Sequence, residues 1–258
     1  MRLYIKYAKV HIMSQLSYRK SFILLTVGQF FVPFIMFISM SLLFQRFGSI
    51  KGWSLYEVAL CYGVINVAYS TSECIFRGFD SFSTLIRNGD FDRILLRPRN
   101  TIIQVLGSKF ELSRIGRLIQ GILVLCFSLI HLNIHFTPLK TFTFIMMLIG
   151  GFIIFSGIYV IGATLCFITV EGIEVVNIFT DGGREMAKYP LGIYKSFVKQ
   201  FFTFIIPFAI INYYPLMYIL DKSENIFYAY TPLFSFLFVI PCLTIWRLGV
   251  SKYTSTGS

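Results

Sequence analysis

The stretch from Ser21 to Phe44 carries no charged residue, and it is the feature that most constrains how this chain folds. A helix needs about 20 mostly apolar residues to cross the hydrocarbon core of a bilayer, which is roughly 30 Å thick. The composition agrees, because 56% of the residues are hydrophobic and 18% are aromatic, with a mean hydropathy of +0.72. These values exceed ordinary globular usage. We therefore expect an all-α integral membrane protein.

Apolar runs of spanning length recur along the whole chain, which we treat as a single transmembrane domain over residues 1–258. They predict six transmembrane helices, at about residues 21–44, 55–76, 118–135, 142–170, 201–220 and 226–246. The two longest segments between them, 77–117 and 171–199, are predicted to be inner loops. An even number of spans places both termini on one side of the membrane.

The distribution of Lys and Arg gives the orientation. With the N-terminus inside, 19 of the 23 basic residues fall in inner segments, and cytoplasmic segments hold the positive excess. We expect cytoplasmic termini and a multi-pass protein in the cell membrane, with the lipid bilayer as its first partner. The net charge of +11 is then a consequence of topology, and no nucleic acid partner is required.

Two other signals are absent from the sequence. The five cysteines all fall in predicted spans, at no metal-ligand spacing, so neither a disulfide framework nor a metal site is expected. The polar start and the long first apolar run do not resemble a cleavable signal, so we expect the first span to stay as an anchor.

Residues 2–19 precede the first span and predict an interfacial amphipathic helix. On a helical projection Arg2, Lys6 and Lys9 share one narrow sector, while apolar residues fill most of the rest. Such a helix lies along the membrane surface with its basic edge toward headgroups. The alternative is a solvated basic tail.

The segment GDFDRILLRPRN, residues 89–100, predicts a short helix in the first inner loop. Asp90 is suited to the N-cap, and Asp92 in the first turn favours the positive end of the helix dipole. Phe91, Ile94 and Leu95 share one apolar face, and Pro98 ends the helix. From the residues alone, this face either docks into another protein or lies flat against the membrane.

A second inner-surface helix is predicted in the segment DGGREMAKYP. Gly182, Gly183 and Pro190 should break helical structure on either side of it. The residues of interest on this helix are Arg184, Glu185, Lys188 and Tyr189.

Polar residues within the spans are costly and are candidates for function. Glu73 lies four residues before Arg77, so an ion pair on one helix face accounts for it. Gln29 and Asn66 lie deeper, where they either bridge helices or line a cavity. Glu57 is either an interfacial carboxylate or a residue at the exit of a transport path.

The fifth predicted span contains Pro207, Tyr213, Tyr214 and Pro215. This pattern predicts short re-entrant or surface helices near the outer face. The alternative is a kinked span whose tyrosines belong to the interfacial belt. The residues of a possible transport path are Gln29, Glu57, Asn66, Tyr213 and Tyr214.

Five segments in fixed order resemble those of one known family. They are GDFDRILLRPRN, KFELSRIGRL, REMAKYPLGIY, NYYPLMYIL and WRLGVSKYTSTGS. Together they look like the signature segments of permease subunits of type-2 (ABC-2 class) ABC exporters, in the six-span subgroup. The resemblance implies a cytoplasmic coupling helix that sits in a cleft of a separate ATPase. By similarity its residues are Asp90, Phe91, Asp92, Arg93, Ile94, Leu95 and Leu96.

The resemblance also implies partners. The chain has no GxxxxGK[ST] segment, so we expect no enzyme activity and no cofactor of its own, with ATP and Mg on the partner. Two ATPase copies and a second permease, identical or unlike, would complete a transporter in a bacterial cell membrane. It would export an amphipathic or hydrophobic solute, such as a drug, lipid or peptide, by alternating access.

Two other classes of protein are rivals. An autonomous channel or ion-coupled carrier requires membrane-central charges, and the predicted spans are nearly free of them. A membrane-embedded enzyme requires clustered acids and histidines, and His11, His131 and His135 have no acid cluster beside them.

Overall fold

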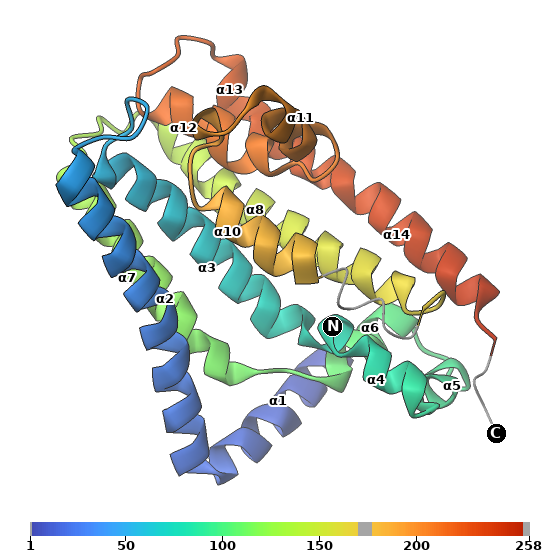
Figure 1. Cartoon of the computed structure of the whole chain (residues 1–258). Coiled ribbons are helices and arrows are strands. Elements are labelled where there is room, and N and C mark those ends of the chain that lie inside the picture. The colour runs from blue at the N-terminus through green and yellow to red at the C-terminus, as the bar shows by residue number, and fades with distance from the viewer. Residues whose placement is uncertain (1, 170–176, 255–258) are drawn as a thin grey trace.

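The computed structural model describes residues 2–169 and 177–254, and the chain there is helical throughout (Figure 1). Within these ranges no strand forms, apart from an isolated bridge between Ile50 and Trp53. The prediction of an all-α membrane protein is confirmed.

The helices before the middle of the chain are α1 Arg2–Ser17, α2 Arg19–Phe47, α3 Leu55–Asp80, α4 Phe82–Arg87, α5 Asp90–Leu95, α6 Thr101–Ser108, η1 Leu112–Arg114 and α7 Ile115–His131. Those after it are α8 Pro138–Leu165, η2 Ile178–Gly182, α10 Gly183–Ala187, η3 Leu191–Ile193, α11 Ser196–Phe204, η4 Ala209–Tyr213, α12 Tyr214–Ile219, α13 Phe227–Tyr230, η5 Thr231–Phe234 and α14 Ser235–Lys252.

Helix α3 is the central helix of the bundle. It packs along α7 and α8, while α2 packs mainly on α7 and α14 on α8. The apolar stretch of α3 is 78% buried, against 11% for α2 and 17% for the α13–α14 stretch. A capping box between Ser54 and Glu57 fixes where α3 begins. The core therefore runs along α3, and the two edge helices leave most of their apolar surface for lipid or another chain.

Five helices are long and apolar enough to cross a membrane, and they match five of the predicted spans. The sixth prediction, one helix over 201–220, is corrected. The chain there forms two pieces, Ser196–Phe204 and Ala209–Ile219, which meet at 94°. Pro207 lies in the break, because proline lacks an amide donor and disfavours helical geometry in the residue before it. The expected proline-broken arrangement is present.

The described part of 171–199, a segment predicted to be an inner loop, lies along the central helix α3. η2 and α10 lie beside α3 (Figure 1). Tyr69 in the middle of α3 donates to Asp181 at 2.9 Å, and Lys51, in the loop before α3, donates to the Ile193 carbonyl at 2.8 Å. The segment thus runs along α3 to its N-terminal end. Its charges pair with one another, so they do not need a water-exposed loop.

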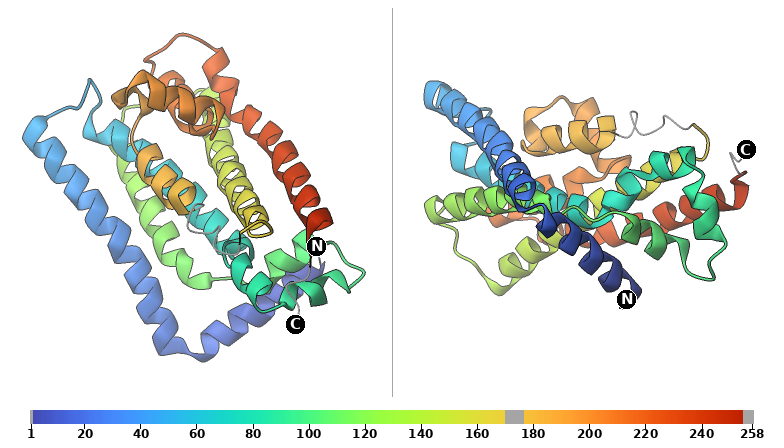
Figure 2. Two further views of the ribbon diagram at one scale, coloured as in Figure 1. Left: turned by 45° about the vertical axis from the view of Figure 1, so that its right-hand side comes forward. Right: turned by 90° about the horizontal axis from the view of Figure 1, so that it is seen from below.

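The N-terminal helix predicted over 2–19 is present as α1, and it is attached to the protein. Gln15 donates to the Phe110 carbonyl at 2.6 Å and accepts from the Leu112 amide at 2.9 Å. Exposed apolar side chains remain on α1, among them Val10 and Met13. Both chain ends lie at the same end of the bundle as α5 (Figure 2). We call this the inner end, and the opposite end, with α12 and α13, the outer end.

Candidate functional site

Helix α5 carries the predicted coupling residues, and its apolar face points into the protein. Phe91 is fully buried and Ile94 is 8% exposed. The Phe91 ring belongs to an aromatic cluster at the inner end, where rings from α3, α4 and α5 meet rings at the ends of α8 and α14. The cluster consists of Phe79, Phe82, Phe91, Phe167, Trp246 and Tyr253. This apolar face was expected to dock into another protein or to lie flat against the membrane, and it is covered by the chain's own side chains.

The start of α5 also differs from the prediction. Gly89, at φ 69°, occupies the N-cap, a conformation that glycine tolerates better than other residues. Asp90 is the first helical residue and pairs with Arg93 at 3.4 Å. Gln104 on α6 donates to the carbonyls of Ile94 and Arg99, each at 3.1 Å, and so fastens the end of α5. The helix is held firmly on both sides.

The exposed side of α5 is small, apolar at its tip and basic around it. Leu95 is 39% exposed and Leu96 85%, and the Arg93 side chain is 73% exposed. Arginines that follow or precede the helix, Arg87, Arg97 and Arg99, are exposed as well. We call the exposed side chains of Arg93, Leu95 and Leu96 the outer face of α5. Here outer means facing away from the protein, and this face lies at the inner end of the bundle.

A second set of candidate residues follows one stripe of α3, which we call the polar seam. Its residues recur every three or four positions and so share one helix face: Tyr62, Asn66, Tyr69, Glu73, Arg77 and Asp80. Side chains from α2, α7 and α10 meet this stripe. Polar side chains therefore continue along α3 from its N-terminal third to its C-terminal end.

Glu73 is the centre of the seam's charged part. Its carboxylate lies 2.7 Å from Arg117, 3.3 Å from Arg114 and 3.9 Å from Arg77. The predicted pair with Arg77 is present but is the longest of these contacts. Arg77 lies closer to Asp80 and to Glu111, the latter at 2.7 Å. A buried carboxylate is stable only when paired, and helix α7 supplies the pairing here.

Gln29 accepts a hydrogen bond from Arg117 at 2.7 Å, so it bridges α2 to the seam. Beside the charged residues lies a polar cavity of about 310 Å³. Its lining residues are Tyr69, Glu73, Arg77, Asp80, Arg114, Arg117, Asn177 and Asp181. Sequence reasoning missed Arg114 and Arg117 because they were counted as loop charges. Arg114, Arg117 and Gln120 recur at every third position and lead into a span. This spacing is the signal that would have found them.

Asn66 and Gln120 form the uncharged part of the seam. Both are fully buried and lie near the Tyr62 hydroxyl, but within the described ranges no atom of either amide has a partner in good hydrogen-bond geometry. A Cβ placed on Gly121 of α7 would lie 3.2 Å from the Asn66 Cβ, so α3 and α7 are close here. Unsatisfied buried amides each cost about 1 to 3 kcal/mol, which makes them candidates for a role outside folding.

The predicted second surface helix, with Arg184, Glu185, Lys188 and Tyr189, lies against the seam. Arg184 stacks over the Tyr69 ring at 4.5 Å, and Lys188 lies 5.0 Å from the Tyr62 ring centre. Glu185 pairs with Arg184 at 2.8 Å and with Lys188 at 2.6 Å. Tyr189 packs on the apolar cluster around Trp53. The basic side chains face inward while Glu185 stays 46% exposed.

The remaining predicted path residues gather at the outer end. Glu57 pairs with Lys222 at 2.8 Å, and Lys222 stacks over Trp53 at 4.0 Å. Tyr213 contacts Trp53 at 6.4 Å between ring centres, and Tyr214 contacts Tyr228 at 5.1 Å. These contacts tie the α12–α13 region to the loop before α3. The structure thus brings Gln29 and Asn66 to the seam, and Glu57, Tyr213 and Tyr214 to the outer end.

The fold defines an all-α membrane protein with a buried polar seam and a short exposed helix at its inner end. Residues 30–257, most of the chain, match the family described as ABC-2 family transporter protein. The chain belongs to this family, and it is a membrane permease of the ABC transporter class. No curated protein and no solved structure matches the chain.

Proposed function

We propose that the chain is the permease subunit of an ATP-driven exporter and works with a separate ATPase. The observation that supports this most directly is the mounting of α5. Its outer face is exposed, while Phe91 is clamped between rings attached to α4, α8 and α14. A displacement of α5 would move those helices directly, because the packed rings connect them and no flexible loop lies between. This is what coupling to an ATPase requires.

The partner supplies ATP hydrolysis in this proposal. The chain itself has no GxxxxGK[ST] segment, so ATP and Mg would bind two copies of the ATPase. A second permease, identical or unlike, would complete the membrane part. Both chain ends share the inner end with α5 (Figure 1), which agrees with cytoplasmic termini in a bacterial cell membrane.

The solute path would use the polar seam and the outer closure. Asn66 and Gln120 lack partners in this structure, so a moving solute or its water could satisfy them when α3 and α7 separate. The ion pair between Glu57 and Lys222, 2.8 Å apart, would break when the solute leaves at the outer end. A seam of polar groups within apolar helices suits an amphipathic solute, such as a drug, lipid or peptide, moved outward by alternating access.

The test must avoid Phe91, because replacing a buried ring disturbs folding. We would purify Leu96→Asp and Arg93→Glu with the cellular ATPase and measure ATP hydrolysis and solute export into vesicles. Ile226→Asp is the matched control, since Ile226 is 59% exposed and lies at the outer end. Loss of ATPase capture in the α5 variants alone would support the proposal. If both α5 variants exported solute at the rate of the unmodified chain, the proposal would be refuted.

One observation favours the rival ion-coupled carrier. The spans were expected to lack a charged relay, yet Glu73, Arg114 and Arg117 form a buried charged group beside a polar cavity. Ionisable residues at such positions also serve proton and ion pathways. Vesicles that hold the purified chain alone distinguish the two functions. Transport driven by an ion gradient without ATP or ATPase would favour the carrier.

A further inference from the structure

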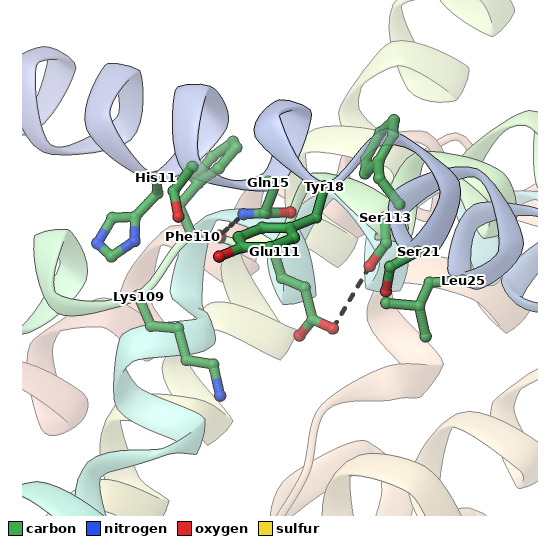
Figure 3. Close-up of a pocket in the computed structure, with 11 residues that line it drawn as sticks. His11, Gln15, Tyr18, Ser21, Leu25, Lys109, Phe110, Glu111 and Ser113 are labelled. Carbon is green, nitrogen blue, oxygen red and sulfur yellow. Dashed lines mark hydrogen bonds between the residues drawn. The ribbon is translucent and has the colours of Figure 1, made fainter.

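A cavity of about 410 Å³ lies at the elbow between α1 and α2 (Figure 3). The end of α1, the first turns of α2 and residues 109–113 form its walls. Its lining residues are His11, Ser14, Gln15, Tyr18, Ser21, Phe22, Leu25, Lys109, Phe110, Glu111 and Ser113. None of these residues takes part in the polar seam or the outer face of α5, although Glu111 pairs with Arg77 of the seam.

The polar wall of this cavity offers unused hydrogen-bond donors. Ser14, Tyr18, Ser21 and Lys109 line it, and within the described ranges their side chains make no hydrogen bond or ion pair. By contrast His11 and Gln15 are engaged, His11 with the Gly107 carbonyl at 3.1 Å. Three hydroxyl groups and one ammonium group around one cavity suit a ligand rich in acceptor oxygens.

Glu111 also lines the cavity, but its charge is already balanced. Its carboxylate lies 2.7 Å from Arg77 and 3.2 Å from Arg114. Burial alone would raise the pKa of Glu111, and the neighbouring arginines outweigh it, so the pKa lies below its usual range. Arg19 and Lys20 follow Tyr18 directly and are exposed. With Lys109, they leave the rim of the cavity positively charged.

The other wall is apolar and continues onto the surface of the first span. Phe22, Leu25 and Phe110 line it, and Leu25 is 54% exposed. Basic residues followed at once by a long apolar helix mark the boundary between headgroups and hydrocarbon. The cavity therefore has its polar wall at headgroup level and its apolar wall beside the acyl chains.

We propose that the elbow cavity binds an anionic phospholipid of the adjoining leaflet. The phosphate would accept hydrogen bonds from Ser14, Tyr18 and Ser21 and pair with Lys109, while an acyl chain lies along Phe22 and Leu25. A headgroup bound there contacts α1, α2 and the segment that starts η1. Occupancy would thus stabilise the angle of the elbow.

The test is native mass spectrometry of the purified full chain, titrated with phosphatidylglycerol and with phosphatidylcholine of the same acyl chains. We expect phosphatidylglycerol to bind more tightly. Lys109→Glu should weaken it by about tenfold, because reversing the charge removes an attraction and adds a repulsion. Lys252→Glu is the matched control, since Lys252 is exposed at the end of α14 and does not line the cavity.

A second variant tests the cavity without changing charge. Ser21→Trp fills it with a side chain that the membrane interface accepts, and it should reduce binding of phosphatidylglycerol; Ser14→Trp does the same from α1 if the first variant fails to fold. Equal loss in Lys252→Glu, or equal binding of phosphatidylcholine, would overturn the proposal. Equally tight binding of glycerol phosphate would show a soluble phosphate ligand and overturn the assignment to a lipid.

Discussion

The ring of Phe91 packs edge-on against the ring of Tyr253, with 5.0 Å between their centres. The two residues lie far apart in the sequence: Phe91 is on α5, and Tyr253 is the residue after α14. This contact attaches the proposed coupling helix to the last span. Phe91 therefore holds α5 in place, whereas the exposed Arg93 and Leu96 are available to a partner.

Phe91→Ala should destabilise the protein strongly. Loss of a fully buried phenylalanine from a packed core costs about 3 to 5 kcal/mol, and Phe91 is 0% exposed. Leu96→Ala on the same segment should leave stability nearly unchanged, because Leu96 is 85% exposed. Thermal unfolding in a mild detergent measures both. Similar melting temperatures for the two variants would contradict the inward orientation of Phe91.

Arg117→Met should destabilise the bundle, and Glu73→Gln should partly rescue it. Removing Arg117 leaves Glu73 with only its longer contacts, 3.3 Å to Arg114 and 3.9 Å to Arg77. The loss should therefore stay below the about 3 to 5 kcal/mol that a completely broken buried pair costs. Neutralising Glu73 removes the charge that has lost its closest partner. The thermal stability of both single variants and the double variant gives the coupling. Additive losses would mean that the two side chains do not interact.

The sequence was informative where the signal is local. An apolar run and its length are contained within one segment, so five predicted spans coincide with helices long and apolar enough to cross a membrane. Pro207 marks the break in the remaining segment for the same reason. The N-terminal helix also follows from its own residues.

The sequence was misleading where the outcome depends on distant residues. The pattern of Phe91 and Ile94 shows that one face of α5 is apolar, but not that Trp246 and Tyr253 cover it. Glu73 has Arg77 four residues away, yet its shortest contact is with Arg117. The charges of 181–188 indicated a helix on the inner surface, because their partners on α3 cannot be known from that segment alone.

Gly116→Ala and Gly28→Ala should have opposite effects on stability. A Cβ on Gly116 would lie 2.0 Å from the Thr26 carbonyl oxygen, whereas a Cβ on Gly28 would meet nothing within 4 Å. Alanine in a helix interior is otherwise favoured over glycine by about 1 kcal/mol. Gly116→Ala should therefore push α2 from α7 and lower the melting temperature, while Gly28→Ala leaves it unchanged or raises it. A neutral Gly116→Ala would contradict the close crossing of these helices.

Lys222→Glu should loosen the outer end, and exchanging both charges should restore it. Lys222 lies 2.8 Å from Glu57, with side chains 26% and 15% exposed. Partial exposure limits such a pair to about 1 kcal/mol, so the expected change is local. Hydrogen–deuterium exchange over residues 48–57 should become several-fold faster in Lys222→Glu, because two carboxylates then face each other. The Glu57→Lys, Lys222→Glu double variant should return it toward the original rate, although it loses the capping box between Ser54 and Glu57. Glu57→Ala loses both this cap and the ion pair, so it is the matched control. A double variant that exchanges no more slowly than Glu57→Ala would contradict the pairing of Glu57 with Lys222.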